Sequence, residues 1–323
     1  MEHIFDTNVA NFEENSIAIF KLQYAQNAVY RQYCRHLGIT HAESVTSLLQ
    51  IPFLPISFFK THQVRSFSAE PSLKFYSSAT GNTGRSEHAI LHPEIYTKSF
   101  TLSFENYFGP IKNCCILGLL PSYLEKEGSS LIFMVQHLMQ LSAHPLNGFF
   151  LFEHDQLLER ILFLEQKKEP YFLFGVSFAL LDFARKFKLN LQYGKIIETG
   201  GMKGRKKEIT RDELHQELTS GFGSNRIFSE YGMTELLSQA YANTNGHYQL
   251  PKWMQVRISD LNDPFSFLPT GKTGILNIID LANIASCAFI QTSDLGKLNV
   301  DGTFEVLGRA DHSDIRGCSL LVG

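Results

Sequence analysis

The sequence predicts an α/β body that is followed by a β-rich end. Between about residues 70 and 250, short apolar strand-like runs alternate with helical patterns, and after about Leu250 the helical pattern stops. The chain has 323 residues, of which 44% are hydrophobic and 19% are charged, as in a soluble globular protein. It is long enough for one large domain or for two ordinary ones.

The first fifty residues are expected to be largely helical. Apolar side chains recur there at roughly helical spacing, namely Phe12, Ile17, Phe20, Ala25, Val29 and Tyr33. Pro52 and Pro55 break the pattern in the stretch IPFLPISFF. We therefore expect a helical N-terminal segment over residues 1–70.

The alternating part opens with the short strand KFYSS and with a helix that Pro93 starts at its first position. CCILGLL then predicts a continuous apolar strand, as in a sheet that is buried on both faces. The stretch GSS at 128–130 is expected to cap the next helix. The apolar face of that helix is formed by Leu131, Met134, Val135 and Leu138.

The same alternation continues to about residue 250. YFLFGVSFALLDFARKF repeats strand, turn and helix, and KIIETGG is a strand that ends in two glycines. Thr210 and Glu213 fit a capping box at the start of DELHQEL. Beyond Leu250 the predicted strands are WMQVRIS, GILNIID, CAFIQTS, GKLNV and TFEVLG, with a hairpin turn at Asp301-Gly302.

Charge and composition argue against several classes of protein. The net charge of -3 argues against a nucleic-acid binder, and the one dense basic cluster, Lys203 with residues 205–207, is short. The acidic start MEHIFDTNVANFEEN has no apolar core of a secretion signal. The longest apolar stretch, at about 114–120, is far below the ~20 residues of a membrane helix. We expect a cytoplasmic protein with no membrane span.

The cysteines point to a reducing compartment. There are five, an odd number without metal-ligand spacing. Cys114 and Cys115 are expected in the core of an apolar strand, and Cys34 and Cys287 are expected to be structural.

A loop rich in glycine and hydroxyl side chains lies in FYSSATGNTGRSEH. It contains Ser77, Ser78, Thr80, Gly81, Thr83, Gly84 and Arg85. Small residues let backbone N–H groups approach an anion, so phosphate binding is one interpretation and a flexible turn is the other. The loop lacks the Gly-Lys-Ser/Thr ending of a Walker loop. TGKT at 270–273 resembles that ending but precedes the strand ILNIID, which favours a turn between strands.

YGMTE is the next stretch with chemistry. Tyr231 is an aromatic plate that could stack on a base, and Thr234 offers a hydroxyl donor. The carboxylate of Glu235 could hold Mg²⁺ beside a phosphate. An ordinary junction between a strand and a helix is the alternative.

Two further motifs lie near the end of the chain. Asp294 in QTSDLG could accept two hydrogen bonds from a ribose diol, or it could be a turn residue. Arg309 and Asp311 in LGRAD come just after a strand, where they could also be only a polar hinge.

The loop, ETGG, YGMTE, TSDLG and GRAD each occur once, in that order. This series resembles the adenylate-forming superfamily of acyl-CoA ligases, adenylation domains and luciferases. IPFLPISFFK, LLPSYLEKEGSSLIFM, FLFGVSFALL, ETGGMKGRKKEITRDELH and GRADHSDIRGCSLL are similar to LuxE-type acyl-protein synthetases and span nearly the whole chain. The resemblance implies one catalytic domain over 1–307, with the N-terminal-domain fold of that superfamily, helices layered on mixed sheets, and a β-rich portion over 250–307.

The resemblance also implies a ligase that activates a carboxylic acid with ATP and Mg²⁺. By this resemblance Thr234 bonds the α-phosphate and Glu235 holds the metal. The other nucleotide-binding residues are Ser77, Ser78, Thr80, Gly81, Thr83, Gly84 and Arg85 around the leaving phosphates, Gly200 and Gly201 against the adenine, Tyr231 stacked on it within Tyr231-Gly232-Met233, and Asp294 with Arg309 at the ribose.

Two departures from the superfamily pattern concern lysines. In the loop, Asn82 replaces a threonine, and Ser86 and Glu87 stand where Pro-Lys is usual, so Arg85 is the nearby cation. Fourteen residues follow Arg309, so the small C-terminal lid domain, which supplies a second lysine in the superfamily, is expected to be absent.

Acyl-protein synthetases carry their acyl group on a cysteine near the C-terminus. The matching residue is Cys318, in a hinge and tail over residues 308–323. A thiolate is a strong nucleophile toward an acyl-adenylate, and Arg316 nearby favours the thiolate form. A small tail residue without a catalytic role is the alternative.

A fatty acid is the substrate that the resemblance favours. Phe149, Phe150, Phe172, Phe174 and Phe178 either line an apolar acyl pocket or belong to the core. The implied partner is an acyl reductase or an acyl carrier protein. Two alternatives stay open: a ligase that acylates coenzyme A or a carrier protein, and a catalytically inactive nucleotide-binding or assembly subunit.

Overall fold

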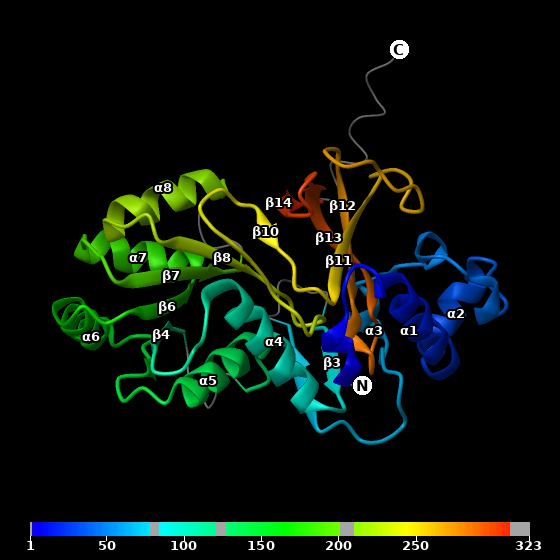
Figure 1. Ribbon diagram of the computed structural model, residues 1–323, viewed down its shortest axis with the longest axis horizontal. Coiled ribbons are helices and arrows are strands. Elements are labelled where there is room, and N and C mark those ends of the chain that lie inside the picture. The colour runs from blue at the N-terminus through cyan, green and yellow to red at the C-terminus, as the bar shows by residue number, and fades with distance from the viewer. Residues whose placement is uncertain (1, 78–83, 121–126, 201–209, 311–323) are drawn as a thin grey trace, which may run out of the picture.

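The computed structural model describes residues 2–77, 84–120, 127–200 and 210–310 (Figure 1). Within these ranges, twelve strands form one mixed sheet in the order β11-β12-β13-β14-β10-β9-β8-β7-β6-β4-β5, with β1 beside β13. Strands β2 and β3 form a separate hairpin. None of the helices described is long and apolar enough to cross a membrane.

The helices are α1 (Phe12–Gln26), α2 (Ala28–His36), α3 (Phe58–Thr61), α4 (Pro93–Phe108), α5 (Ser130–Ser142), α6 (His154–Lys167), α7 (Ser177–Phe187) and α8 (Arg211–Phe222). The strands are β1 (Leu54–Pro55), β2 (Leu73–Tyr76), β3 (Glu87–Ile90), β4 (Cys115–Leu119), β5 (Gly148–Phe149), β6 (Tyr171–Val176), β7 (Gly194–Thr199), β8 (Ile227–Tyr231), β9 (Ala240–Ala242), β10 (Tyr248–Gln249), β11 (Met254–Ser259), β12 (Thr273–Asp280), β13 (Phe289–Leu298) and β14 (Phe304–Arg309).

Strands β5, β4, β6, β7 and β8 form the parallel half of the sheet, with helices on both faces (Figure 1). Successive side chains of a strand point to opposite faces, which divides its residues between two cores. In β6, Phe172 and Phe174 join the core with α4 and α5, while Leu173 joins the core under α6, α7 and α8. This double burial explains why β4 and β6 are apolar runs rather than alternating ones.

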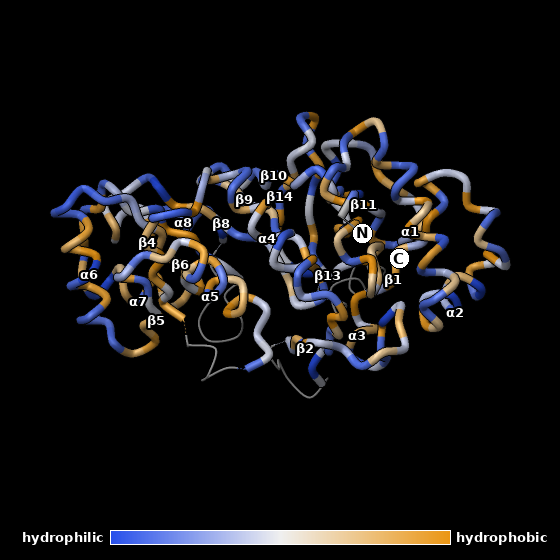
Figure 2. Tube along the Cα trace, turned by 60° about the horizontal axis from the view of Figure 1, so that its bottom comes forward, coloured by the Kyte–Doolittle hydropathy of each residue, from blue (hydrophilic) through white to orange (hydrophobic). Residues whose placement is uncertain are grey.

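The other half of the sheet, from β9 to β11, is antiparallel, and β1 pairs in parallel with β13. Helices α1 and α2 lie against this half, where the Phe20 ring contacts those of Tyr30 and Phe289. Hydrophobic and hydrophilic residues alternate along these helices, as expected for helices with one buried face (Figure 2).

Several local expectations are confirmed. Pro93 is at the start of α4, the capping box of Thr210 and Glu213 opens α8, and β4 is buried throughout. TGKT at 270–273 leads into β12, with Gly271 at a φ of 86°, so it is a turn ahead of a strand.

Three details differ from the sequence-based expectation. Ser129 is the N-cap residue of α5, but its side chain makes no capping hydrogen bond. CAFIQTS and GKLNV are not two strands but parts of the single strand β13, because an irregularity at Leu295/Gly296 lets its pairing with β14 continue. Cys114 is only half-buried, whereas Cys115 is in the core as expected.

Candidate functional site

The polar motifs gather at the carboxyl ends of the parallel strands. Tyr231 is the last residue of β8, and Gly200 directly follows β7. Because Thr199 pairs with Glu230 in the sheet, Gly200 and Tyr231 are the next residues along two neighbouring strands. Ligand sites of open α/β sheets lie at this edge.

Tyr231 is joined to the candidate ribose-binding residue. Its hydroxyl donates a hydrogen bond of 2.8 Å to Oδ2 of Asp294, 63 positions further along the chain. Its ring is buried and meets the rings of Tyr248 and Phe304 at steep angles. Burial, and then the Asp294 charge, raise the pKa of Tyr231, so its hydroxyl stays a donor at neutral pH.

Asp294 and Arg309 face each other across β13 and β14. They are register partners, and Nε of Arg309 is 3.5 Å from Oδ1 of Asp294. The Asp294 side chain is 13% exposed and that of Arg309 is 67% exposed. A carboxylate has about four lone-pair sites, so Asp294 can accept further hydrogen bonds from a ligand diol.

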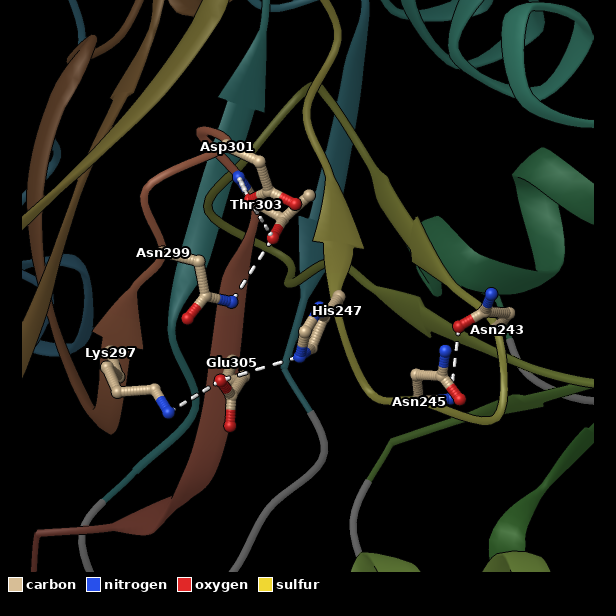
Figure 3. Close-up of polar contacts among 8 residues, drawn as sticks. All are labelled: Asn243, Asn245, His247, Lys297, Asn299, Asp301, Thr303 and Glu305. Carbon is tan, nitrogen blue, oxygen red and sulfur yellow. Dashed lines mark hydrogen bonds and ion pairs between the residues drawn. The ribbon is translucent and has the colours of Figure 1, made fainter. Parts of the chain in front are cut away.

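The β13–β14 hairpin is also fixed at its other end, as Figure 3 shows. Asp301 accepts hydrogen bonds from the amide and the hydroxyl of Thr303, at 3.0 and 2.6 Å. Glu305 lies 2.8 Å from Lys297 and 3.7 Å from His247, which precedes β10. The hairpin that carries Asp294 is therefore held by polar contacts between its own strands and by one contact with the segment before β10.

The turn after β8 contains Gly232, Met233 and Thr234, which are partly exposed, and Glu235, whose side chain is buried. Two fully buried side chains hold its backbone. Nδ1 of His88, in β3, is 2.7 Å from the Thr234 carbonyl oxygen, and Nδ2 of Asn283 donates to the Glu235 carbonyl oxygen at 2.8 Å. Burial lowers the pKa of His88 to about 4, so its ring is neutral near pH 7.

Asp280 holds the continuation of this turn. Its Oδ2 accepts hydrogen bonds from the amides of Leu237 and Ser238, at 2.8 and 3.0 Å. Burial raises the pKa of Asp280, and these hydrogen bonds oppose the increase. The sequence analysis missed His88, Asn283 and Asp280, because only the fold brings them to YGMTE.

The hydroxyl-rich loop lies at the tip of the β2–β3 hairpin. The amide of Ser77 donates to the Ser86 carbonyl, and the amide of Ser86 donates to the Ser77 hydroxyl at 2.9 Å. Gly84 and Arg85 are exposed, and Gly84 has a φ of 77°. The expected binding residues Ser78, Thr80, Gly81 and Thr83 lie outside the described residues.

Gly200 offers an accessible backbone at the same edge. Its φ is 73°, and no atom of the described residues lies within 4 Å of the place where a Cβ would stand. The Ser177 hydroxyl lies 2.6 Å from the Gly200 carbonyl oxygen and 2.8 Å from Oε2 of Glu198. Gly201 and Cys318 lie outside the described residues.

Two buried carboxyl groups flank this edge on opposite faces of the sheet. Burial, opposed by a hydrogen bond from Thr199, raises the pKa of Glu230 to about 7. Burial also acts to raise the pKa of Glu198, but hydrogen bonding from His215 and the Arg211 charge outweigh it and leave that pKa below its ordinary value. Glu230 packs against Gly232, so its protonation state bears on the turn.

The phenylalanines proposed for an acyl pocket are divided between the two cores. Phe172 and Phe174 pack with Phe104 of α4, and Phe150 is buried in the other core. Phe149 and Phe178 are half-buried. The stretch LLPSYL extends beyond the described residues.

The residues present fit a nucleotide and a metal ion whose remaining ligands would be phosphate oxygens. No group of three His, Cys, Asp or Glu side chains within the described ranges is arranged to hold a metal ion. Mg²⁺ is commonly bound by one or two carboxylates together with substrate phosphates, and Glu235 can supply one carboxylate. The open backbone at Gly200 and the partly exposed Asp294 carboxylate suit a base and a ribose.

Solved structures with the same architecture were found by comparison. ATP-bound MatB from Rhodopseudomonas palustris aligns with a TM-score of 0.55 and 18% identity over 75% of this chain, which spans about half (49%) of that chain. 2-Hydroxyisobutyryl-CoA ligase in complex with 2-HIB-AMP aligns with a TM-score of 0.70 and 12% identity, over 94% of this chain and 70% of that one. The fold is therefore that of the adenylate-forming enzymes.

Sequence comparison then gives the family. The profile described as "Acyl-protein synthetase, LuxE" matches residues 1–323. Two curated relatives are long-chain-fatty-acid--luciferin-component ligases from Vibrio harveyi and Aliivibrio fischeri, each 22% identical over 93% of this chain, which covers 84% and 85% of their lengths. The chain belongs to the LuxE acyl-protein synthetase family and is an enzyme of the ligase class.

Proposed function

We propose that this enzyme activates a carboxylic acid with ATP and transfers the acyl group to its own Cys318. The observation that carries the proposal is the hydrogen bond between Tyr231 and Asp294, because it unites two motifs that the adenylate-forming resemblance assigns to one nucleotide. The family match over the whole chain supports the same reaction.

In the first step the acid's carboxylate oxygen attacks the α-phosphorus of ATP. A new P–O bond forms, the bond to the β-phosphate oxygen breaks, and acyl-AMP and pyrophosphate result. Thr234 donates to the α-phosphate, and Asp294 accepts hydrogen bonds from the ribose. Mg²⁺, bound through Glu235 and the phosphates, would neutralise the charge that develops on the leaving group.

In the second step the Cys318 thiolate attacks the acyl carbon of acyl-AMP. A thioester forms and AMP leaves, while the thiol proton passes to solvent. Catalysis of both steps consists mainly of alignment and of the stabilisation of phosphate charge. The acyl-enzyme then delivers its acyl group to an acyl reductase or to an acyl carrier protein.

We propose a long-chain fatty acid as the substrate. The support is the name of the two curated relatives, which are long-chain-fatty-acid ligases. The apolar side chains Phe149 and Phe178 are half-buried and are the expected neighbours of an acyl chain.

The test of activation is acid-dependent exchange of labelled pyrophosphate into ATP. Straight-chain acids of increasing length, with short and hydroxylated acids for comparison, should show exchange that is fastest with long chains. ATP binding without exchange for any acid would contradict the proposal and would favour an inactive nucleotide-binding subunit.

The test of self-acylation uses a labelled fatty acid and ATP. We expect protein-bound label that survives acid precipitation and is released by neutral hydroxylamine, as a thioester is. Cys318→Ser should lose the label but keep the exchange activity. Cys114→Ser is the matched control, because Cys114 is the half-buried cysteine among those described. Full labelling of Cys318→Ser would show that the acceptor is another residue.

A ligase that acylates coenzyme A is the second candidate, and the fold shared with 2-hydroxyisobutyryl-CoA ligase favours it. The same labelling reaction separates the two. If coenzyme A is the acceptor, its addition should produce free acyl-CoA at a similar rate in Cys318→Ser and in the wild type.

A further inference from the structure

A buried histidine connects the two parts of the site that resemblance assigns to phosphates. His88 belongs to β3, the strand that leads out of the hydroxyl-rich loop, and it is fully buried. Its Nδ1 is 2.7 Å from the carbonyl oxygen of Thr234, which is 146 positions away in the sequence. Because a carbonyl oxygen only accepts, Nδ1 is the donor of this hydrogen bond.

Asn283 completes the connection from the other side. Its Nδ2 donates to the carbonyl oxygens of Glu235 and Cys287, at 2.8 and 2.9 Å, which fixes the orientation of its amide. Its Oδ1 lies 3.1 Å from Nε2 of His88, which carries no proton in the neutral ring, so this contact is packing and not a hydrogen bond. Two consecutive carbonyl groups, those of Thr234 and Glu235, are thus held by two side chains that also contact each other.

Both residues are fully buried and are held by further contacts. The ring of Phe59 meets the His88 ring edge-on, with centroids 5.6 Å apart. The backbone oxygen of Asn283 accepts a hydrogen bond from Gln23 of α1 at 2.9 Å. Buried polar groups that are hydrogen-bonded in this way rigidify the segments they join.

We propose that His88 and Asn283 are positioning residues for the reaction, which fix the backbone of Thr234 and Glu235 relative to strand β3. The inference rests on the proposed function, since it assigns the side chains of Thr234 and Glu235 to phosphate and metal. Neither His88 nor Asn283 touches substrate. They act by setting where two other side chains point.

The size of the effect follows from geometry. A misplacement of about 1 Å in a catalytic group costs about 100-fold in rate. His88→Phe keeps a ring of similar shape and loses the hydrogen bond to the Thr234 carbonyl. We expect its kcat for acid-dependent exchange to fall about 100-fold, while the KM for ATP changes less than about 3-fold, because alignment and not binding is lost.

The conservative variant separates positioning from simple packing. The amide nitrogen of asparagine stands close to the place of Nδ1 in histidine, so His88→Asn can still donate to the Thr234 carbonyl. We expect it to keep kcat within about 10-fold of the wild type. Since His88 and Asn283 hold consecutive carbonyl groups of one turn, His88→Phe combined with Asn283→Ala should be scarcely slower than His88→Phe alone.

Amide hydrogen exchange tests the same link without any activity. The amides of Leu237 and Ser238 donate to Asp280 just beyond the held carbonyls. In His88→Phe they should exchange at least about 10-fold faster, because their turn opens locally. Ile161→Ala, in the core under α6, destabilises the fold away from the site and should leave these two amides protected relative to global unfolding.

The outcomes decide the proposal separately from the proposed function. If none of the acids supports pyrophosphate exchange by the wild-type protein, the proposed function fails. The protection of the Leu237 and Ser238 amides from hydrogen exchange then decides by itself whether His88 holds the turn. Unchanged protection in His88→Phe overturns the proposal. A folded His88→Phe protein with kcat within about 3-fold of wild type also overturns it, because the contacts would then be structural only.

Discussion

The parallel and antiparallel halves of the sheet place their polar side chains differently. In the parallel half, β4 and β6 are apolar on both faces, and the buried polar side chains of the described strands lie in the second halves of β7 and β8, as with Glu198, Ser229 and Glu230. In the antiparallel half, buried polar residues such as Asn277 and Asp280 lie within or directly after the strands. The contrast indicates that β4 and β6 serve mainly packing, and the proposed site lies where the two halves meet.

The largest effect on activity is expected at that junction. Asp294→Ala removes the proposed acceptor for the ribose and leaves the Tyr231 hydroxyl without its Asp294 partner. Hydrogen bonds to a charged group contribute about 1.5–3 kcal/mol each, so exchange should fall about 1000-fold, or about 4 kcal/mol. Asp301→Ala, at the other end of the same hairpin, is the control and should keep full activity. Similar losses in both variants would mean that the hairpin, and not the carboxylate, matters.

A core variant in the parallel half should show the opposite pattern. Leu173→Ala leaves a cavity in β6, where the side chain is fully buried under α6, α7 and α8. The free energy of unfolding should fall by about 2–5 kcal/mol in chemical denaturation. The exchange rate per folded molecule should stay within about 3-fold of wild type. A large loss in kcat would show that the core of the parallel half also affects the reaction, which contradicts the distinction between the two halves.

The buried carboxyl group at the junction predicts a pH-dependent stability. Burial raises the pKa of Glu230 from 4.5 to about 7, so the folded protein binds a proton that the unfolded chain releases above pH 4.5. The contribution of Glu230 to the free energy of unfolding is complete below pH 4.5. It is lost as the pH rises to 7, at about 1.4 kcal/mol per pH unit, or about 3 kcal/mol in all. Glutamine does not titrate, so the stability deficit of Glu230→Gln relative to the wild type should be largest at pH 4.5 and smallest at pH 8. Melting curves of both proteins at each pH measure this difference. An unchanged difference across this range would contradict the pKa.

The smallest effect is expected at the surface of the antiparallel half. Lys297 pairs with Glu305 at 2.8 Å, and both side chains are partly exposed (Figure 3). Exposed ion pairs contribute about 0–1 kcal/mol. Lys297→Met should change the free energy of unfolding by less than about 1 kcal/mol and leave exchange unaltered. A larger loss of stability or of exchange activity would show that this ion pair matters as much as the residues at the junction of the two halves.

Features set by neighbouring residues could be predicted from the sequence. The capping box of Thr210 and Glu213 needs only residues three positions apart, and the buried strand β4 follows from a run of apolar residues. Those predictions depend on patterns that are contiguous along the chain. Which distant motifs share one nucleotide was implied by the resemblance to adenylate-forming enzymes and not by any local pattern.

Features set by contacts between distant residues could not be predicted. His88 is the last residue of the stretch FYSSATGNTGRSEH, but nothing local marks it, because its contacts are with Thr234 and Asn283, which are 146 and 195 positions away. The continuity of β13 depends likewise on how β14 accommodates the irregularity at Leu295. Neither hydrophobic period nor local propensity contains that information.

The bond from Gln23 to the backbone of Asn283 has a consequence for how the enzyme matures on the ribosome. This hydrogen bond joins residues 260 positions apart, so it cannot form until most of the chain that follows α1 has been synthesised. Contacts of such separation form late, because long loops must close before they are made. In a nascent chain, Asn283 can therefore hold the backbone beside Thr234 and Glu235 only after the segment between β12 and β13 has emerged. Until then the parallel strands have been synthesised without Asn283, which holds the Glu235 carbonyl in the complete protein.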